Sequence, residues 1–173
     1  MTVVKPIINP ALLRSVAGRF PTGVTVITTT TPAGPAGFTC QSFTSLSLDP
    51  ALISFNVSRS SDTWPLVREA GVFCVNVLAA DQQETARAFA RRHTDRFAGI
   101  PHSCHLGNGT PRLSGATAWL EATVEGTHAG GDHLIVIGRV TAAAAGDREE
   151  TLLFHRGAYG STGSEAERLR SAG

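Results

Sequence analysis

The chain has little charge of either sign and no long apolar run. Only 17% of its 173 residues are charged, and the formal net charge is +1. A balance this close to neutral argues against a protein that binds nucleic acid through its electrostatic field. The apolar runs are too short to span a bilayer, and the N-terminus lacks the basic segment and long apolar run of a signal peptide. We therefore expect a cytoplasmic protein that binds neither nucleic acid nor a membrane.

Cysteine is also scarce. The three cysteines, Cys40, Cys74 and Cys104, are far apart in the sequence, which fits reduced thiols in the cytoplasm better than a disulfide framework. The segment His102-Ser103-Cys104-His105 places thiol and imidazole ligands close together. Its spacing matches no common zinc pattern and a second ligand pair is missing, so we interpret it as a surface loop and predict no metal site.

Several catalytic motifs are missing as well. The sequence contains no Gly-x-Ser-x-Gly elbow and no phosphate-binding loop that ends in Gly-Lys-Ser/Thr. The triplet Gly107-Asn108-Gly109 lacks a third glycine and does not follow a clear strand, so it is not a dinucleotide fingerprint. These absences argue against common hydrolases and against the usual nucleotide-binding loops.

What is present is a series of short strands. They are expected where Val, Ile and Thr are frequent or where apolar and polar residues alternate. These segments are residues 22–30, 37–48, 51–57, 72–78, 116–125, 133–145 and 151–154. Three helices, at about residues 10–18, 63–70 and 81–91, interrupt the series without regular alternation, which argues against a doubly wound sheet. The pattern predicts one mainly β domain over residues 1–160, an antiparallel barrel with peripheral helices, and a polar tail over 161–173.

Two of the predicted helices have specific features at their ends and faces. In the first helix, Asn9 is the expected N-cap and Pro10 lies in the first turn. Its apolar stripe is expected to be buried, and it consists of Leu12, Leu13, Val16 and Phe20. In the third helix, Asp81 and Glu84 have the spacing of a capping box.

The most informative stretch runs from Gly37 to Pro50. It begins as an apolar strand and continues as a run of small hydroxyl and amide residues, whereas a strand made only for packing would alternate. These polar residues are Thr39, Gln41, Ser42, Thr44, Ser45 and Ser47. Such a strand can bind the polar edge of a flat heterocycle, or it can simply face water at the edge of a barrel; the stretch alone leaves both interpretations open.

A second polar cluster, residues 56–63, lies one strand later and favours binding. It combines hydroxyl groups with Arg59 and with the amides at the start of a helix, a combination suited to an anion. A strand that binds a ring edge next to a turn that binds an anion fits a phosphorylated aromatic ligand such as a flavin nucleotide.

Six segments, in order, resemble the short-chain flavin reductase family, the reductase components of two-component flavin-dependent monooxygenases. They are residues 20–29, 37–50, 73–78, 95–100, Gly130-Gly131-Asp132-His133 and the stretch from Leu153 to Tyr159. Together they cover the chain from about residue 11 to 160. The resemblance implies a flavin-binding, antiparallel Greek-key split β-barrel that forms a homodimer. It also implies an enzyme in which NADH or NADPH reduces FMN or FAD, and which supplies reduced flavin to a partner monooxygenase.

The resemblance also implies residue roles. The flavin ring and its ribityl chain would contact Pro35, Ala36, Gly37, Phe38, Thr39, Gln41, Ser42, Asn56, Val57 and Ser58. The phosphate would lie near Ser60, Ser61, Asp62 and Thr63, and Phe89 would close one side. His133 would act at the flavin face where nicotinamide stacks, and the nicotinamide nucleotide would contact Phe154, His155, Arg156, Gly157 and Tyr159. At the dimer interface we expect the more polar face of the strand at 116–125, which consists of Thr117, Trp119, Glu121, Thr123 and Glu125.

Two departures from the family pattern, and two other functions, stay open at this point. Many relatives have an aromatic residue where this chain has His155, and close relatives have arginine where it has Ala88. The same fold could also serve as a non-catalytic flavin-binding module, or as a reductase with tightly held flavin that acts on its own substrate. Neither the choice between FMN and FAD nor that between NADH and NADPH follows from the sequence.

Overall fold

The computed structural model describes residues 8–92, 94–104 and 107–163. His105 and most of the predicted tail therefore lie outside the described residues. The helices are α1 (Pro10–Ala17), α2 (Trp64–Ala70) and α3 (Gln83–Ala90). The strands are β1 (Thr22–Gly23), β2 (Thr25–Thr31), β3 (Gly34–Cys40), β4 (Thr44–Leu48), β5 (Ala51–Ser58), β6 (Val72–Val77), β7 (His102–Ser103), β8 (Arg112–Leu113), β9 (Ala118–Gly130), β10 (His133–Ala145), β11 (Leu152–His155) and β12 (Ala158–Ser161).

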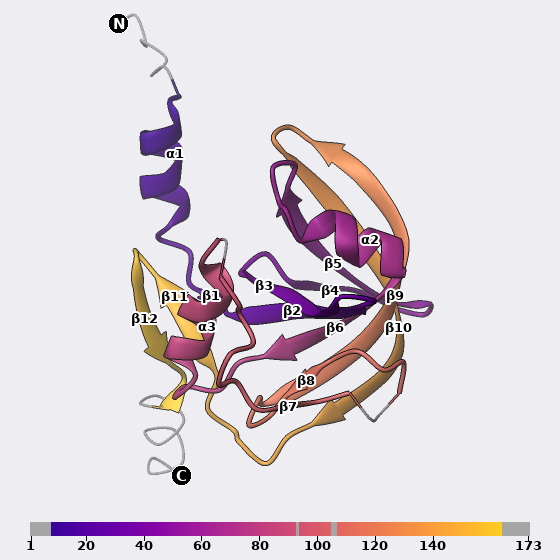
Figure 1. Ribbon diagram of the computed structural model, residues 1–173. Helices are drawn as coiled ribbons and strands as arrows, with labels where there is room; N and C mark the ends of the chain where they lie inside the picture. The colour runs from indigo at the N-terminus through magenta and orange to yellow at the C-terminus, as the bar shows by residue number, and fades with distance from the viewer. Residues whose placement is uncertain (1–7, 93, 105–106, 164–173) are drawn as a thin grey trace, which may run out of the picture.

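Seven strands form one antiparallel sheet in the order β3-β2-β6-β9-β10-β5-β4. The sheet curls around the core, and the long hairpin β9–β10 joins its two halves (Figure 1). A smaller sheet, β1-β11-β12, lies beside α3, and β7 pairs with β8. The predicted mainly antiparallel β fold with peripheral helices is confirmed. No helix of the described residues is long and apolar enough to cross a membrane.

The core has two parts. The larger part packs Phe55 edge-on against Phe73 and Trp64, and α2 contributes Trp64 and Val67 to it. The smaller part lies under α3, where Phe89 packs edge-on against Phe97 at a centroid distance of 4.8 Å. The two peripheral helices α2 and α3 are thus held by apolar residues that the sheet buries.

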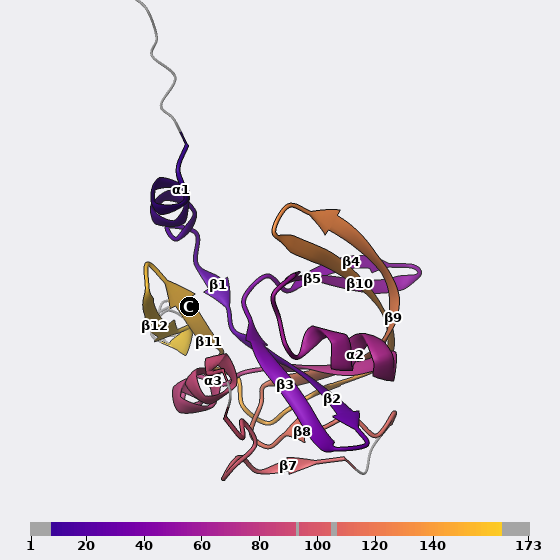
Figure 2. The ribbon, with the colours of Figure 1, turned by 45° about the horizontal axis from the view of Figure 1, so that its top comes forward.

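The helix α1 differs from the sequence prediction. Asn9 caps it as expected, because its side chain accepts a hydrogen bond from the Leu12 amide at 2.9 Å. The predicted buried stripe is wrong: Leu12, Leu13, Val16 and Phe20 are 39%, 58%, 58% and 75% exposed. The physical reason is visible in Figure 2, where α1 projects away from the large sheet instead of packing on it.

Two smaller sequence predictions also need correction. Asp81 and Glu84 form no capping box: the helix begins after Gln82, which makes no side-chain cap bond, and Asp81 pairs with Arg148 instead. The strand β12 was not predicted, because its four residues, Ala-Tyr-Gly-Ser, contain little of the strand pattern. It forms a hairpin with β11 through the two-residue turn Arg156-Gly157.

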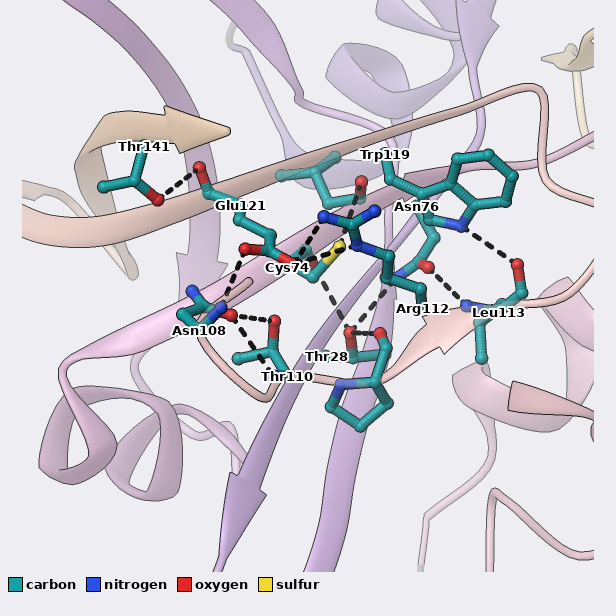
Figure 3. A network of polar contacts seen from close by, with 12 residues as sticks. Thr28, Cys74, Asn76, Asn108, Thr110, Arg112, Leu113, Trp119, Glu121 and Thr141 are labelled. Carbon is teal, nitrogen blue, oxygen red and sulfur yellow. Dashed lines mark hydrogen bonds and ion pairs between the residues drawn. The ribbon is translucent and has the colours of Figure 1, made fainter. Parts of the chain in front are cut away.

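The prediction that the polar face of β9 meets a second copy of the chain stays a prediction, but Glu121 is not available for such a contact, since only 1% of it is exposed. The segment from Asn108 to Leu113 covers it within the same chain, and Figure 3 shows the resulting contacts. We call this group the Glu121 cluster, and it comprises Thr28, Cys74, Asn76, Asn108, Thr110, Arg112 and Glu121.

The contacts of the Glu121 cluster bind the covering segment to three strands. Arg112 donates to Glu121 Oε1 from Nε at 2.8 Å, and the Asn108 amide donates to Oε2 at 2.9 Å. On β6, Asn76 Oδ1 accepts from the Leu113 amide at 2.7 Å, and on β2 the Thr28 hydroxyl donates to the Pro111 carbonyl at 2.5 Å. Glu121 is therefore used inside the protomer, to hold a loop, whereas Glu125 on the same face is exposed.

Candidate active site

A pocket that we call the main pocket has a volume of about 1100 Å³. This volume is slightly above the roughly 300–1,000 Å³ that ligand sites occupy. Its walls come from the end of β3 and the residues after it, from β5 and the loop that follows, from α3, and from the start of β10, with α1 and β11–β12 closing one side. The lining residues are Leu13, Ala17, Phe38, Thr39, Cys40, Gln41, Ser42, Asn56, Val57, Ser58, Ser61, Asp62, Phe89, Ala90, Arg92, Arg96, Gly130, His133, Ile135, Phe154 and Tyr159.

One wall forms where the polar stretch leaves the sheet. β3 ends at Cys40 and β4 begins at Thr44, so Gln41, Ser42 and Phe43 connect them outside the strand ladder. The Ser42 hydroxyl accepts from the Asn56 amide at 2.8 Å and lies 3.2 Å from the Asn56 carbonyl oxygen, which ties this connection to β5. The Thr39 hydroxyl donates to the Ala86 carbonyl of α3 at 2.6 Å. Because both hydroxyls hold neighbouring elements, the main chain and Gln41 are the groups left to meet a ligand here.

A second wall is the loop after β5. Ser58 and Ser60 hydroxyls lie 2.9 Å apart, and the Ser61 hydroxyl accepts from the Trp64 amide at 3.1 Å. Arg92 reaches this loop from beyond α3, with Nη2 3.4 Å from the Ser60 hydroxyl. Hydroxyl groups beside an exposed guanidinium form a surface that suits an anion such as a phosphate.

Arg96 supports the same corner from behind. Only 12% of its side chain is exposed. Its Nη1 donates to the Gly37 carbonyl at 2.8 Å and to the Thr63 hydroxyl at 2.5 Å, and Nη2 lies 3.6 Å from Asp62 Oδ1. Arg96 therefore joins β3 to the start of α2 and adds positive charge to the pocket wall.

His133 stands at the third wall, directly after the turn Gly131-Asp132 that connects β9 to β10. Its Nδ1 lies 2.7 Å from Asp132 Oδ1, and hydrogen bonding from His133 followed by its charge lowers the pKa of Asp132. Arg59 joins this turn to the second wall, since its amide donates to the Asp132 carbonyl and its Nε to the Gly131 carbonyl. With Nδ1 directed at the carboxylate, Nε2 is the ring nitrogen left to meet a ligand.

Aromatic rings close the opposite side of the main pocket. Phe154 and Tyr159 pack edge-on at a centroid distance of 5.1 Å, and Arg87 lies over the Tyr159 ring at 5.7 Å. Phe89 reaches the pocket from α3, and its ring lies against β3 at Gly37. A Cβ at that glycine would meet the Phe89 ring at 2.9 Å and the Ile27 carbonyl at 2.8 Å, so this close approach requires glycine.

The structure brings most, but not all, of the predicted site residues to this pocket. Those that line it are Phe38, Thr39, Gln41, Ser42, Asn56, Val57, Ser58, Ser61, Asp62, Phe89, His133, Phe154 and Tyr159. A neighbouring pocket of about 400 Å³ is lined instead by Pro35, Ala36, Gly37 and Thr63. Ser60 contacts the main pocket through Ser58 and Arg92. Arg156 and Gly157 line a third pocket together with Phe154, while His155 is exposed and bonds the Arg19 carbonyl at 3.1 Å.

The sequence analysis missed the two arginines of the main pocket, Arg92 and Arg96. Both lie in the irregular segment after α3, where no periodicity indicates a direction for the side chains. The available signal was their place in the sequence, just after the helix that carries Phe89. It also missed the apolar contributions of Leu13 and Ala17, because α1 was expected to pack on the core.

The arrangement of these walls in the main pocket fits a flavin nucleotide. A polar edge, an aromatic side and a cationic corner with hydroxyl groups match the ring edge, the ring face and the phosphate of such a ligand. No group of three or more His, Cys, Asp or Glu side chains suited to a metal ion occurs among the described residues.

Comparison with known proteins points to the same class of ligand. The model of the flavin reductase like domain family matches residues 17–163. The chain is 44% identical over 161 residues to the reductase subunit HsaB of a flavin-dependent monooxygenase from Rhodococcus jostii, covering 93% of this chain and 81% of that protein.

Solved structures agree. Nitrilotriacetate monooxygenase component B from Mycobacterium thermoresistibile matches with a TM-score of 0.86 and 41% identity, over 90% of this chain and 87% of that chain. The NADH:FAD oxidoreductase SgcE6 of Streptomyces globisporus, solved with NAD and FAD fragments, matches with a TM-score of 0.83 and 36% identity, over 90% and 96% of the two chains. On the extent of these matches, the chain belongs to the flavin reductase like domain family.

Proposed function

We propose that this protein is an NAD(P)H-dependent flavin reductase that supplies reduced FMN or FAD to a separate monooxygenase. The observation that carries the proposal is the main pocket, in which a polar edge, an aromatic side, a cationic corner and His133 converge. The names of relatives support it, since they include a reductase subunit of a flavin-dependent monooxygenase and an NADH:FMN oxidoreductase.

The chain's own residues would mainly bind and orient. When bound, flavin supplies a hydride acceptor at its N5 atom and reduced nicotinamide supplies the hydride. Main-chain amides near Gln41 and Ser42 would donate to the ring edge and stabilise the negative charge of the reduced ring. Ser58, Ser61 and Arg92 would hold the phosphate, and Arg96 would keep this corner in place. These interactions fix the relative position of two rings, which is the chief demand of a hydride transfer.

His133 is the side chain we assign to the nicotinamide side. Its bond to Asp132 fixes the ring orientation and leaves Nε2 directed elsewhere. In the neutral tautomer Nδ1 carries the proton and Nε2 accepts, so it can receive a hydrogen bond from the carboxamide of nicotinamide. In this role His133 positions the hydride donor, and no side-chain acid or base is required for the transfer itself.

We also propose a homodimer in the cytoplasm, built from one flavin-binding domain over residues 1–160. The exposed apolar side chains of α1 support a second copy as their cover, because Leu13, which lines the main pocket, and Val16 are each 58% exposed. Light scattering on the purified protein tests this. Replacing both residues by aspartate should shift a dimer to a monomer; a wild-type monomer would contradict the proposal.

The activity has a direct test. Purified protein is mixed with NADH or NADPH and an excess of FMN or FAD, and the absorbance of the reduced nicotinamide is followed. We expect oxidation with at least one pairing. If flavin binds but no pairing gives oxidation, the chain is a flavin-binding module instead; if flavin copurifies and does not exchange, it retains its flavin as a prosthetic group.

A further inference from the structure

Arg59 lies in the loop after β5, where the sequence favours a residue that binds an anion. Its neighbours Ser58 and Ser61 line the main pocket, but Arg59 is not among the described residues that do. Its Nε instead donates a hydrogen bond to the Gly131 carbonyl at 2.9 Å, in a segment 72 residues further along the chain. The side chain is therefore bonded to the turn that precedes His133.

This turn consists of Gly131 and Asp132 and joins the two long strands β9 and β10 (Figure 1). His133 pairs with Gly130 on β9 and with Ser58 on β5, so both strand ladders of β10 end at His133. Gly131 has φ of 69°, and a glycine at the first position is typical of a tight type II′ hairpin turn. Because the ladders stop at His133, the turn itself has to be held by other contacts.

Arg59 supplies two such contacts. Its amide donates to the Asp132 carbonyl at 3.0 Å, and its Nε donates to the Gly131 carbonyl. The amide bond continues the strand pairing by one step, and any residue except proline could form it. The bond from Nε depends on the side chain, so it is the contact that calls for arginine at this position.

The turn determines the orientation of His133 through Asp132. His133 Nδ1 lies 2.7 Å from Asp132 Oδ1, and the Asp132 side chain is 94% exposed. A surface pair of this kind is weak unless its geometry is well fixed. The two carbonyls that Arg59 binds belong to the planar peptide groups on either side of the Asp132 Cα. Arg59 therefore fixes the direction of the Asp132 side chain and, through it, the imidazole ring whose Nε2 is left for nicotinamide.

Building on the proposed function, we propose that Arg59 positions His133 for nicotinamide and does not bind the flavin phosphate. It acts through Asp132 and the imidazole ring, so it is a positioning residue. The phosphate has its own groups in Ser61 and Arg92, which both line the main pocket. In this role Arg59 joins the loop that would bind flavin to the turn that meets nicotinamide.

Two simpler roles compete with this one. As a ligand of the phosphate, Arg59 would act through its positive charge. As an ordinary surface arginine, like the exposed Arg68 in the last turn of α2, it would contribute little to either ligand. The positioning role depends instead on one hydrogen-bond donor at Nε, so substitutions that separate the donor from the charge distinguish the three.

Two variants of Arg59 make this separation. In Arg59→Gln the amide nitrogen stands at the same place along the side chain as Nε, so the bond to the Gly131 carbonyl is kept while the charge is lost. In Arg59→Met a side chain of similar reach loses both the donor and the charge. Because Arg59 is exposed and the strand pairing of His133 does not involve its side chain, both variants should keep thermal midpoints within about 3 °C of wild type.

The first measurement needs neither flavin nor turnover. Nitrogen NMR of the His133 ring in flavin-free protein reports which ring nitrogen carries the proton, and comparison with His133→Gln assigns the signal. We expect the tautomer with the proton on Nδ1 to predominate in wild type and in Arg59→Gln, and to lose population in Arg59→Met. Equal tautomer populations in the three proteins would overturn the inference.

The second measurement compares kcat/KM for NADH or NADPH at saturating FMN with the affinity for FMN. Arg59→Met should lower kcat/KM about fivefold, the effect of one ordinary hydrogen bond, and should keep FMN affinity within about twofold. Arg59→Gln and the control Arg68→Met should stay within about twofold of wild type in both quantities. Weaker FMN binding by similar factors in both Arg59 variants would make Arg59 a phosphate ligand, and no change in either would make it a surface charge; each result overturns the inference.

The third measurement asks whether Arg59 acts through His133. If it does, adding Arg59→Met to His133→Ala should lower kcat/KM no further, because the group that Arg59 positions is already absent. A second, full fivefold loss in that background would show that Arg59 acts by another route and would contradict the inference. If wild type gave no turnover, the proposed function would be wrong, and the tautomer of His133 would still decide the role of Arg59.

Discussion

The Glu121 cluster and the polar walls of the main pocket contain similar polar residues, yet those of the cluster are buried and those of the pocket are exposed. In the cluster, Thr28 and Asn76 are fully buried and Glu121 is 1% exposed, and each is bonded within the chain. In the main pocket, Gln41, Asn56, Arg92 and His133 are all exposed. The difference shows that polar residues on a sheet indicate a ligand site only where the chain itself does not cover them.

The cover explains the difference. Over β2, β6 and β9 the segment from Asn108 to Leu113 supplies the missing partners of the strand side chains. Within the described residues no comparable segment lies over the walls of the main pocket, which stay open around a volume of about 1100 Å³. A buried polar group without a partner destabilises the fold, whereas an exposed one is satisfied by water until a ligand replaces it.

The largest expected effect on stability comes from removing the buried carboxylate of the Glu121 cluster. Glu121→Ala leaves the Arg112 guanidinium, whose side chain is 16% exposed, without its carboxylate. Removing one partner of a buried pair typically destabilises by about 3–5 kcal/mol. Denaturant unfolding followed by circular dichroism measures this as a lower free energy of unfolding.

The matched control is Glu125→Ala on the same strand. Glu125 pairs with Arg139 on the surface, where both side chains are about 40% exposed or more, and solvent screens such a pair, so its loss should lower the free energy of unfolding much less. Equal losses in the two variants would show that the Glu121 cluster does not stabilise the fold as described.

The second expected effect concerns turnover and comes from a substitution in the exposed main pocket. His133→Ala should lower the turnover of NADH or NADPH about a hundredfold, which corresponds to a barrier about 2.7 kcal/mol higher, if Nε2 positions the hydride donor. Flavin affinity and the free energy of unfolding should change little, because the His133 side chain is 46% exposed.

Steady-state kinetics at saturating flavin, together with fluorescence titration of FMN, separates these quantities. His133→Gln, whose amide reaches the place of Nε2, should recover part of the turnover. A variant that loses flavin affinity instead of turnover would make His133 part of the flavin wall.

The sequence predicted the strands around the main pocket well, because their composition and their turns are local signals. The strand from His133 to Ala145 agrees with the prediction at both ends, whereas the strand before it, expected over residues 116–125, runs on to Gly130. The exposed apolar face of α1 could not be predicted, since the same apolar spacing describes a helix packed on its own core and a helix left for another surface.

The two polar clusters show a second limit. The alternation around Glu121 correctly predicted a strand, but periodicity reports which residues share a face and not what covers that face. The cover of Glu121 comes from a segment eight or more residues away along the chain that has no periodicity of its own. For the same reason Arg92 and Arg96 were missed, although the flavin reductase class was predicted and agrees with the relatives.

A third, smaller effect concerns FMN affinity and tests the hydrogen bond that ties the β3–β4 connection to β5 in the wall of the main pocket. Ser42→Ala removes the hydroxyl that accepts from the Asn56 amide at 2.8 Å, so the connection between β3 and β4 loses its tie to β5. We expect FMN to bind about tenfold more weakly, which corresponds to about 1.4 kcal/mol and to one lost hydrogen bond. Fluorescence titration measures it, and Ser45→Ala on the exposed strand β4 is the control. Equal FMN affinity in wild type and Ser42→Ala would exclude this junction from flavin binding.

The smallest expected effect concerns thiol reactivity and compares a cysteine of the Glu121 cluster with a cysteine of the main pocket. Burial raises the pKa of the Cys74 thiol, in the Glu121 cluster, to about 12, with the Glu121 charge as a second cause. Burial also raises the pKa of Cys40, which lines the main pocket and lies 3.3 Å from the Ser42 hydroxyl. A raised pKa leaves little thiolate near neutral pH, so both thiols should react slowly with a thiol reagent at pH 8.

In a Cys104→Ser background, FMN should slow the reaction of Cys40 further and leave Cys74 unchanged, because only Cys40 faces the ligand. Mass spectrometry of the labelled peptides reads each site separately, and equal protection of the two thiols by FMN would contradict the division into a closed and an open cluster.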